Sequence, residues 1–138
     1  MGKVRRIAVS LPAELAVEFE KAIAKKAYSN RSKAVADVFR EYLSKIEWQE
    51  GGNAVGTITI LYDHHKRGVM DKLTELQHCS GNLILSSLHV HLDHGNCLEV
   101  IVARGEAKRI EFLANSLISA KGVKQGRLAS MASVGSCQ

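Results

Sequence analysis

Hydrophobic and polar residues alternate near the start of the chain. In residues 4–11, VRRIAVSL, the side chains of Ile7, Val9 and Leu11 fall on one face of an extended segment, which is the pattern of a strand. A lone strand cannot satisfy its own backbone hydrogen-bonding groups. We therefore expect this strand to pair with the same strand of a second chain.

Two helical patterns follow the strand. Residues 13–27 and 32–46 carry apolar side chains three and four positions apart, the spacing of one helix face. The sequence YSNRS separates them and supplies capping side chains for the second helix. Residues 1–48 therefore predict a unit of one strand and two helices, and QEGGNA at 49–54 is expected to be a linker.

The second half of the chain predicts a ferredoxin-like domain over residues 54–138. The expected strands are 55–62, 83–92, 97–104 and 123–131, and the expected helices are 66–79 and 106–120, with Gly122 ending the last helix. The resulting order β-α-β-β-α-β is that of the ferredoxin-like fold. The predicted fold class is therefore α+β.

Candidate chemistry is concentrated in LHVHLDHGNC, residues 88–97. His89 and His91 lie two positions apart on an expected strand, so they share a face. A three-residue loop would bring Cys97 and Glu99 to that face, whereas a loop of two or four residues would turn Cys97 away. Imidazoles and a thiolate suit zinc, nickel(II) or copper(II), so the pattern predicts a metal site without naming the metal.

The loop length and the choice of sheet face decide where a fourth ligand comes from. A three-residue loop places Asp93 opposite Cys97 and His91 opposite Glu99. The other face of the two strands is the more apolar one, with Ile84, Leu88, Val90, Leu92, Leu98, Val100 and Val102. We expect that face to lie under the helices, so that the histidine face is open and packs on another subunit. His78, on a covering helix, would then reach a neighbouring chain's cluster better than its own.

The composition of the chain narrows the classes of protein to which it can belong. Of 138 residues, 46% are hydrophobic and 24% charged, which is a globular composition. Neither a membrane span nor a signal peptide is recognisable, so we expect a cytoplasmic protein without a membrane partner. The three cysteines are too few for a disulfide framework; Cys79 is expected to be a free thiol, and Cys137 lies in a tail of small residues.

Most of the net charge of +5 is gathered in the first half. The basic residues there include Lys3, Arg5, Arg6, Lys21, Lys25, Lys26, Arg31, Lys33 and Arg40. A basic half of this kind indicates a polyanionic partner such as DNA, although a solvated surface explains the charge equally well.

Together these stretches resemble the NikR-type nickel-responsive transcriptional regulators, which join a ribbon-helix-helix DNA-binding domain to an ACT-like ferredoxin-fold domain. The resemblance spans about residues 4 to 130 and rests on NRSKAVADVFR (30–40), YDHHKRG (62–68), QH (77–78) and LHVHLDHGNCLEV (88–100). The last stretch together with QH is highly specific, whereas the first is shared with other ribbon-helix-helix proteins.

The resemblance implies a nickel site whose ligands come from two subunits. His89, His91 and Cys97 match three Ni²⁺ ligands, and His78 matches the fourth, which a neighbouring subunit donates. The implied assembly is a homotetramer, a dimer of dimers with intersubunit metal sites. Tyr62 and Glu99 are expected to orient ligands from behind, and His64, His65 and His94 to be surface residues or weak secondary sites.

The resemblance also implies that two paired strands enter the major groove of double-stranded operator DNA. The expected DNA-binding residues are Lys3, Arg5, Arg6, Ala8, Ser10, Arg31 and Ser32. Arg6 can bond a guanine edge, whereas Ala8 offers no hydrogen bond, which indicates a different operator. The implied function is nickel-responsive regulation, as a repressor of nickel-uptake genes.

One departure from the family concerns a second cation. The family's RSEAIRD is RSKAVAD here, so Lys33 replaces an acid. In some members that acid, with the residue matching Asp37, helps to hold a secondary cation. The sequence does not decide whether a cation binds beside Asp37.

Three other function classes compete with this interpretation. An enzyme, such as a hydrolase using metal-bound water, is disfavoured because the protein fills all four expected ligand positions. A metal-storage protein is disfavoured by the basic strand-helix-helix unit. The alternative that stays open is a ribbon-helix-helix regulator that senses zinc, copper or a small-molecule effector through its ACT-like domain. The His/Cys set argues only against the small-molecule effector.

Overall fold

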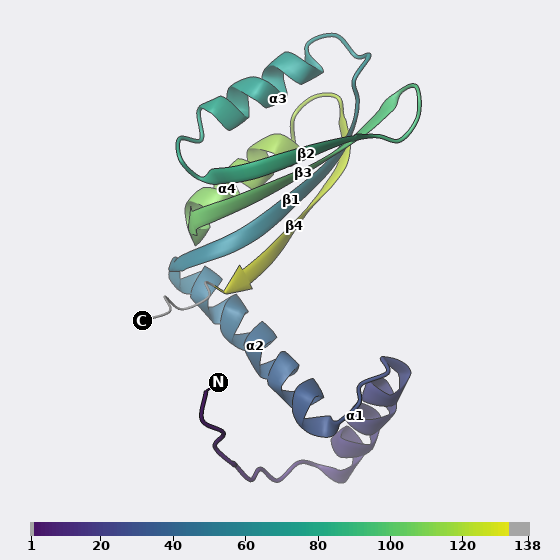
Figure 1. Cartoon of the computed structure of the whole chain (residues 1–138), viewed down its shortest axis with the longest axis vertical. Coiled ribbons are helices and arrows are strands. Elements are labelled where there is room, and N and C mark those ends of the chain that lie inside the picture. Colours follow the sequence, from purple (N-terminus) through teal and green to yellow (C-terminus); the bar gives the residue numbers. More distant parts are fainter. Residues whose placement is uncertain (1, 133–138) are drawn as a thin grey trace. The chain divides into compact units, whose positions relative to one another are not determined.

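The computed structural model describes residues 2–132, and the chain divides into two compact units between Phe39 and Arg40. Figure 1 labels the elements. In chain order they are α1 (Ala13–Lys25), α2 (Arg31–Glu50), β1 (Asn53–Asp63), α3 (Val69–His78), β2 (Ile84–His91), β3 (Asn96–Glu106), α4 (Ala107–Ile118) and β4 (Val123–Ala132). The predicted order of helices and strands after residue 12 is therefore confirmed.

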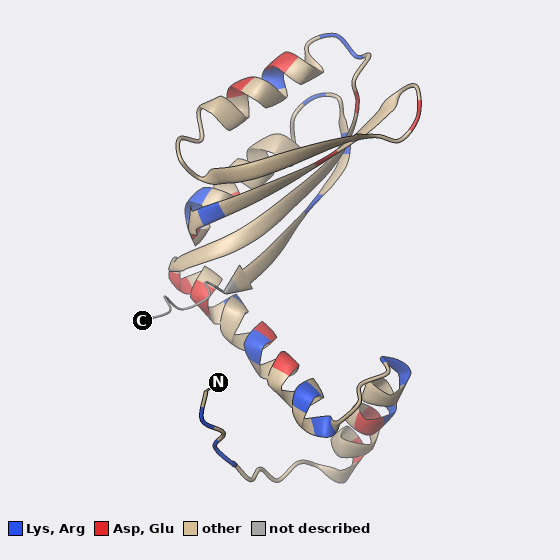
Figure 2. Ribbon diagram, viewed as in Figure 1, with Lys and Arg blue, Asp and Glu red and all other residues tan. Residues whose placement is uncertain are grey.

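The N-terminal unit consists of an irregular segment, α1 and the first part of α2. The side chain of Asn30 accepts a hydrogen bond from the backbone N–H of Lys33 at 2.8 Å, which confirms the expected cap at the start of α2. Ala34 is almost fully buried between the helices, at 1% exposed. Figure 2 shows Lys and Arg along the first segment and at the turn between α1 and α2.

The strand predicted at residues 4–11 does not form in the single chain. Residues 2–12 lie in neither helix nor strand, and Ile7 and Val9 are 64% and 68% exposed. The physical reason is that an isolated segment has no second strand with which to form the hydrogen bonds of a sheet.

The linker expected at 49–54 is also wrong. Helix α2 continues to Glu50, and β1 begins at Asn53, so that two glycines alone separate them. The backbone N–H of Gly52 bonds the carbonyl of Glu47 at 3.1 Å, and Gly51 has a φ of +78°. This is a glycine-ended helix running directly into a strand.

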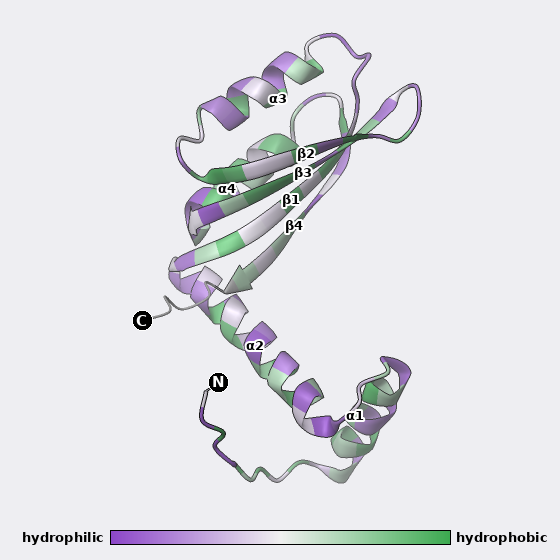
Figure 3. Cartoon of the chain, viewed as in Figure 1, coloured by the Kyte–Doolittle hydropathy of each residue, from purple (hydrophilic) through white to green (hydrophobic). Residues whose placement is uncertain are grey.

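The C-terminal unit is a four-stranded antiparallel sheet in the order β2-β3-β1-β4, with α3 and α4 on one face (Figure 1). This is the predicted ferredoxin-like arrangement. Along β1, and along β3 as far as Ala103, every second residue is buried. Figure 3 shows that hydrophobic residues recur along the strands of this sheet.

The predicted choice of core face is wrong. The buried cluster contains Cys97 and Ile101 of β3 and Tyr62 of β1, together with residues of both helices. The face with Leu88 and Val90 is the open one; these side chains are 61% and 37% exposed. The prediction weighed β2 and β3 alone, but β2 is an edge strand, and the central strand β1 decides which face the helices cover.

Within residues 2–132, no helix combines the length and the apolar composition that a membrane span needs.

Two glycines with positive φ lie near the start of helix α3, and the space around them differs. Gly122 has a φ of +96°, and a Cβ there would lie 2.1 Å from Cγ2 of Val69. Gly68 has a φ of +84°, but no atom lies within 4 Å of the corresponding Cβ. Gly122 therefore allows the turn after α4 to approach the start of α3.

We predict that Gly122→Ala destabilises the fold by about 2–4 kcal/mol, since backbone strain and an overlap with Val69 add together. Gly68→Ala is the matched control, which carries the strain without the overlap and should cost about 1 kcal/mol. Urea unfolding of both variants measures the difference. Equal losses would show that the approach of Val69 to Gly122 is not tight in solution.

Candidate metal centre

The hairpin of β2 and β3 brings His91 directly opposite Cys97, and His89 opposite Glu99. The predicted pairing, which put Asp93 opposite Cys97 and His91 opposite Glu99, is therefore wrong by two positions. Because strand faces alternate with a period of two, a shift by two leaves every side chain on its predicted face. The shared face predicted for an odd loop is therefore present, and the alternative of an even loop is wrong.

Asp93 closes the connection between β2 and β3. Its Oδ1 accepts hydrogen bonds from the backbone N–H groups of Gly95 at 2.9 Å and Asn96 at 2.8 Å. The side-chain amide of Asn96 also donates to Oδ2 at 2.9 Å. These bonds, led by the one from the Asn96 side chain, hold the pKa of Asp93 below its usual range. The ionised carboxylate thus closes the turn that ends the ladder at His91 and Cys97.

The shared face is the one that the helices cover. Cys97 is only 2% exposed and pairs with Tyr62 across the β1–β3 ladder. His89 and His91 lie on the edge strand and remain exposed. The site therefore combines a buried thiol with two accessible imidazoles.

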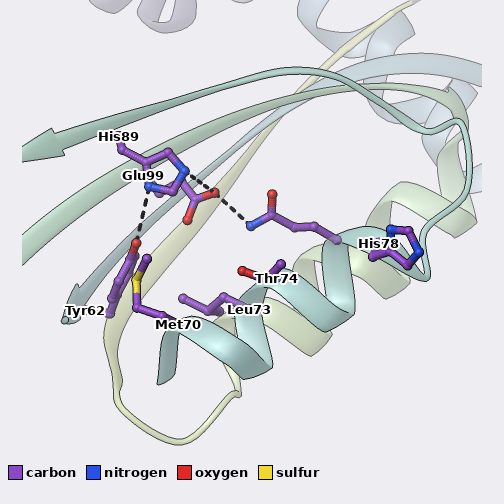
Figure 4. Close-up of a pocket in the computed structure, with 8 residues that line it drawn as sticks. Tyr62, Met70, Leu73, Thr74, His78, His89 and Glu99 are labelled. Carbon is purple, nitrogen blue, oxygen red and sulfur yellow. Dashed lines mark hydrogen bonds and ion pairs between the residues drawn. The ribbon is translucent and has the colours of Figure 1, made fainter. Parts of the chain in front are cut away.

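A cavity of about 320 Å³ opens beside His89, between α3 and the sheet. Its lining residues are Tyr62, Met70, Leu73, Thr74, Gln77, His78, His89 and Glu99, of which Figure 4 draws the side chains. The cavity is the space at the edge of the sheet into which the ring of His89 projects.

Glu99 is the polar centre of this cavity. It is 1% exposed, and its Oε1 accepts a hydrogen bond from the amide of Gln77 at 2.8 Å. The same oxygen lies 3.4 Å from Nε2 of His89, and the Tyr62 hydroxyl lies 3.4 Å from Nδ1 of that ring (Figure 4). A buried carboxylate is stabilised only when it is paired, and here Gln77 and His89 supply the partners.

His78 stands at the C-terminal end of α3. The expectation that its helix covers the opposite face of the sheet from the histidines is wrong, because α3 packs its Leu73 into the same cluster as Cys97. His78 lines the same cavity as His89, yet in Figure 4 its ring points away from His89 and Glu99. Within residues 2–132, no three His, Cys, Asp or Glu side chains gather closely enough to hold a metal ion.

The loop between β1 and α3 brings a further histidine to the hairpin, which the sequence pattern did not reveal. The ring centroid of His64 lies 5.1 Å from that of His91 and 4.1 Å from that of His65. His64 is tied to the hairpin by a backbone bond to the carbonyl of Gly95 at 3.3 Å. The ring of His65 contacts the carbonyl of His94. Periodicity gives no signal for such a contact, because it joins two loops.

The cysteines differ in their surroundings. Cys97 is a buried free thiol, and Cys79 is an exposed free thiol, as expected. Cys137 lies outside the described residues.

The residues expected to contact DNA are exposed. Lys3, Arg5, Arg6, Ala8 and Ser10 all lie on the irregular N-terminal segment. At the start of α2, Ser32 is exposed, whereas the guanidinium of Arg31 forms an ion pair with Glu20 of α1.

Comparison with known proteins places this geometry in a family. A family model described as the NikR C terminal nickel binding domain matches residues 55–131. A protein of Thermococcus kodakarensis assigned as a nickel-responsive regulator is 48% identical over 127 residues, which cover 91% of this chain and 92% of that protein. A Methanocaldococcus jannaschii protein of the same assignment is 44% identical over 133 residues, covering 95% and 94%.

Among solved structures, the ACT domain from the GTP pyrophosphokinase of Chlorobium tepidum matches with a TM-score of 0.47 and 14% identity, covering 56% of this chain and 99% of that domain.

We predict a pH dependence that originates in Tyr62. Burial, followed by the neighbouring Cys97 and Glu99, raises its pKa well above the ordinary value of 10.0. The unfolded chain therefore releases this proton first, and stability that is present below about pH 10 is lost as the pH rises further, by up to about 1.4 kcal/mol per pH unit. Urea unfolding at several alkaline pH values should give a steeper loss for the wild type than for Tyr62→Phe. Parallel losses would contradict a raised pKa.

Proposed function

From the premise that this chain belongs to the NikR family of nickel-responsive regulators, we propose that it is a nickel-dependent repressor that binds operator DNA. The chain carries the family's nickel-binding domain and is not an enzyme. The observation that carries the proposal is the pairing of His91 with Cys97, with His89 on the same face of the same hairpin.

His89, His91 and Cys97 are the proposed ligands of one chain. A bound nickel ion would be coordinated by these three donors and by a fourth ligand. The donor set fits, because two imidazoles and a thiolate are groups that nickel(II) accepts, and because His91 pairs with Cys97 in the ladder while His89 lies two residues away on the same face. Glu99 and Tyr62 contact His89 from two directions, which supports their role in holding its ring in position.

The fourth proposed ligand is His78 of a neighbouring chain. Its own α3 holds it at the exposed end of the helix, with the ring directed away from His89 (Figure 4). The proposed assembly is a homotetramer, a dimer of dimers. It is supported by the open sheet face, where Leu88 and Val90 are exposed in the single chain, since an apolar face of this kind favours contact with another subunit.

The proposed DNA-binding element is a two-stranded ribbon built from residues 4–11 of two chains. Ile7 and Val9 are exposed in one chain, and pairing would give both the apolar side and the backbone a partner. The opposite side would present Arg6, Ala8 and Ser10 to the major groove. Lys3, Arg5 and the start of α2 at Arg31 and Ser32 would contact phosphates.

Nickel binding can favour DNA binding only if the DNA-binding arrangement holds the ion more tightly than the alternative arrangement. A site shared between His78 of one chain and Cys97 of another can meet this condition, because its completion depends on how the chains are placed. Linkage then requires that operator DNA tighten nickel binding by the same factor.

We predict that two variants that each bind nickel poorly restore tight binding when they are combined. His78→Ala and Cys97→Ala are unfolded, mixed and refolded together, and nickel affinity is measured by equilibrium dialysis. In mixed assemblies, His78 of a Cys97→Ala chain can complete the site formed by the intact hairpin of a His78→Ala chain. The recovered stoichiometry should lie below that of the wild type.

Each variant refolded alone is the control, and native mass spectrometry verifies that mixed assemblies form. A site within one chain gives no rescue, because every chain then lacks one ligand of its own. Verified mixed assemblies that do not bind nickel tightly would contradict a site shared between two chains. Wild-type affinity in Cys97→Ala alone would remove the thiol from the site.

We predict that Arg6→Ala weakens operator binding by about 1–3 kcal/mol and relaxes the sequence preference at one base pair, because a guanine-bonding side chain is lost. Lys3→Ala is the matched comparison and should weaken all DNA sequences alike while it flattens the salt dependence. Fluorescence anisotropy with operator and random duplexes measures both effects. If Arg6→Ala weakens both duplexes equally, Arg6 contacts phosphate rather than a base.

A further inference from the structure

In the N-terminal unit, both carboxylate oxygens of Asp37 are engaged by donors of the same unit. Nζ of Lys33 lies 2.5 Å from Oδ1, and the hydroxyl of Tyr28 donates to Oδ2 at 3.0 Å. Lys33 and Asp37 stand one helical turn apart on α2, at the (i, i+4) spacing. The side chain of Asp37 is 31% exposed, so it is partly withdrawn from water.

These contacts belong to a set that closes the junction between α1 and α2. Tyr28 lies in the turn between the helices, so its bond to Asp37 joins that turn to the second turn of α2. Asn30 caps α2 through the N–H of Lys33. The ion pair of Arg31 with Glu20 joins the start of α2 to α1. Protein groups thus contact both carboxylate oxygens of Asp37 and hold the start of α2 against α1.

The secondary cation that some members of the resembled family hold does not fit this set. A bound cation needs several oxygen ligands, preferably with more than one carboxylate. Here the position of the second acid holds Lys33, whose ammonium group carries a positive charge and three donors but no acceptor. A metal ion at Asp37 would meet this charge at close range and would have to displace it.

We propose that the Lys33 ammonium group is a built-in cation of the N-terminal unit, and that no dissociable metal ion binds at Asp37. The pair lies near the surface, with Lys33 57% exposed, so its contribution to stability is small. The effect of the pair is to exclude a metal ion from Asp37. The charge at the junction of α1 and α2 therefore does not depend on the concentration of free cations. If the chain has the function proposed above, its DNA binding then responds to metal through the His/Cys site alone.

The test uses the full-length protein and calcium, a cation that prefers oxygen ligands and competes poorly for imidazole and thiolate. Thermal unfolding is followed with calcium chloride and with sodium chloride at equal ionic strength. The wild-type midpoint should be the same in both salts. In Lys33→Glu, which restores a second acid, calcium should raise the midpoint by about 5 °C.

Two variants control for the added charge. Lys45→Glu creates an acidic pair with Glu41 at the same (i, i+4) spacing on the same helix; both side chains there are well exposed, so little response to calcium is expected. Lys33→Gln removes the ammonium group without adding an acid, and should lose a little stability without gaining a response.

A calcium-dependent rise in the wild type that Asp37→Asn abolishes would overturn the proposal. So would a Lys33→Glu variant that ignores calcium, or one that responds no more than Lys45→Glu. If Lys33→Glu does not fold, the wild type, Asp37→Asn and Lys33→Gln still decide whether the native junction binds a cation.

A second measurement separates this inference from the proposed function. Operator affinity of the nickel-loaded wild type should be equal in sodium and potassium salts at one ionic strength. A chain that binds no DNA would refute the proposed function and leave the unfolding result intact. DNA binding that requires one of the two cations, and that Asp37→Asn abolishes, would refute the built-in cation alone.

Discussion

The two-residue period of the central strands is the constraint on which the C-terminal unit depends. Residues two apart on β1 and β3 must face the same side, and α3 and α4 cover the side with Tyr62, Cys97 and Ile101. The thiol is therefore part of the hydrophobic core, while His89 and His91 extend the same face on the uncovered edge strand β2. Core packing fixes one proposed ligand and leaves the other two accessible.

This arrangement explains why a carboxylate is buried at the site. On the covered face, Glu99 is withdrawn from water, and the position costs free energy unless its oxygens are paired. Gln77 of α3 and His89 of β2 supply those partners. Glu99 thus links α3, which ends at His78, to β2, which carries His89. Within one chain, the helix and the strand that carry proposed nickel ligands are therefore joined through this carboxylate.

The two units are incomplete in different ways. The N-terminal segment lacks a second strand, and the C-terminal sheet leaves Leu88 and Val90 uncovered. Both features favour association with further copies of the chain. A regulator with this design would combine DNA binding and metal binding through assembly, whereas the α1–α2 junction, closed by Lys33 and Asp37, is complete within one chain.

The sequence by itself determined the order of the elements after residue 12 and the common face of His89 and His91, because both follow from local periodicity. Cys97 and Glu99 share that face only because the hairpin has the odd spacing that the structure shows. Only the tertiary structure decided which face the helices cover, since that depends on the neighbours of β3, and the central strand β1 outweighs the edge strand β2. The hairpin register likewise followed from hydrogen bonds of the Asp93 turn, which no hydropathy pattern records.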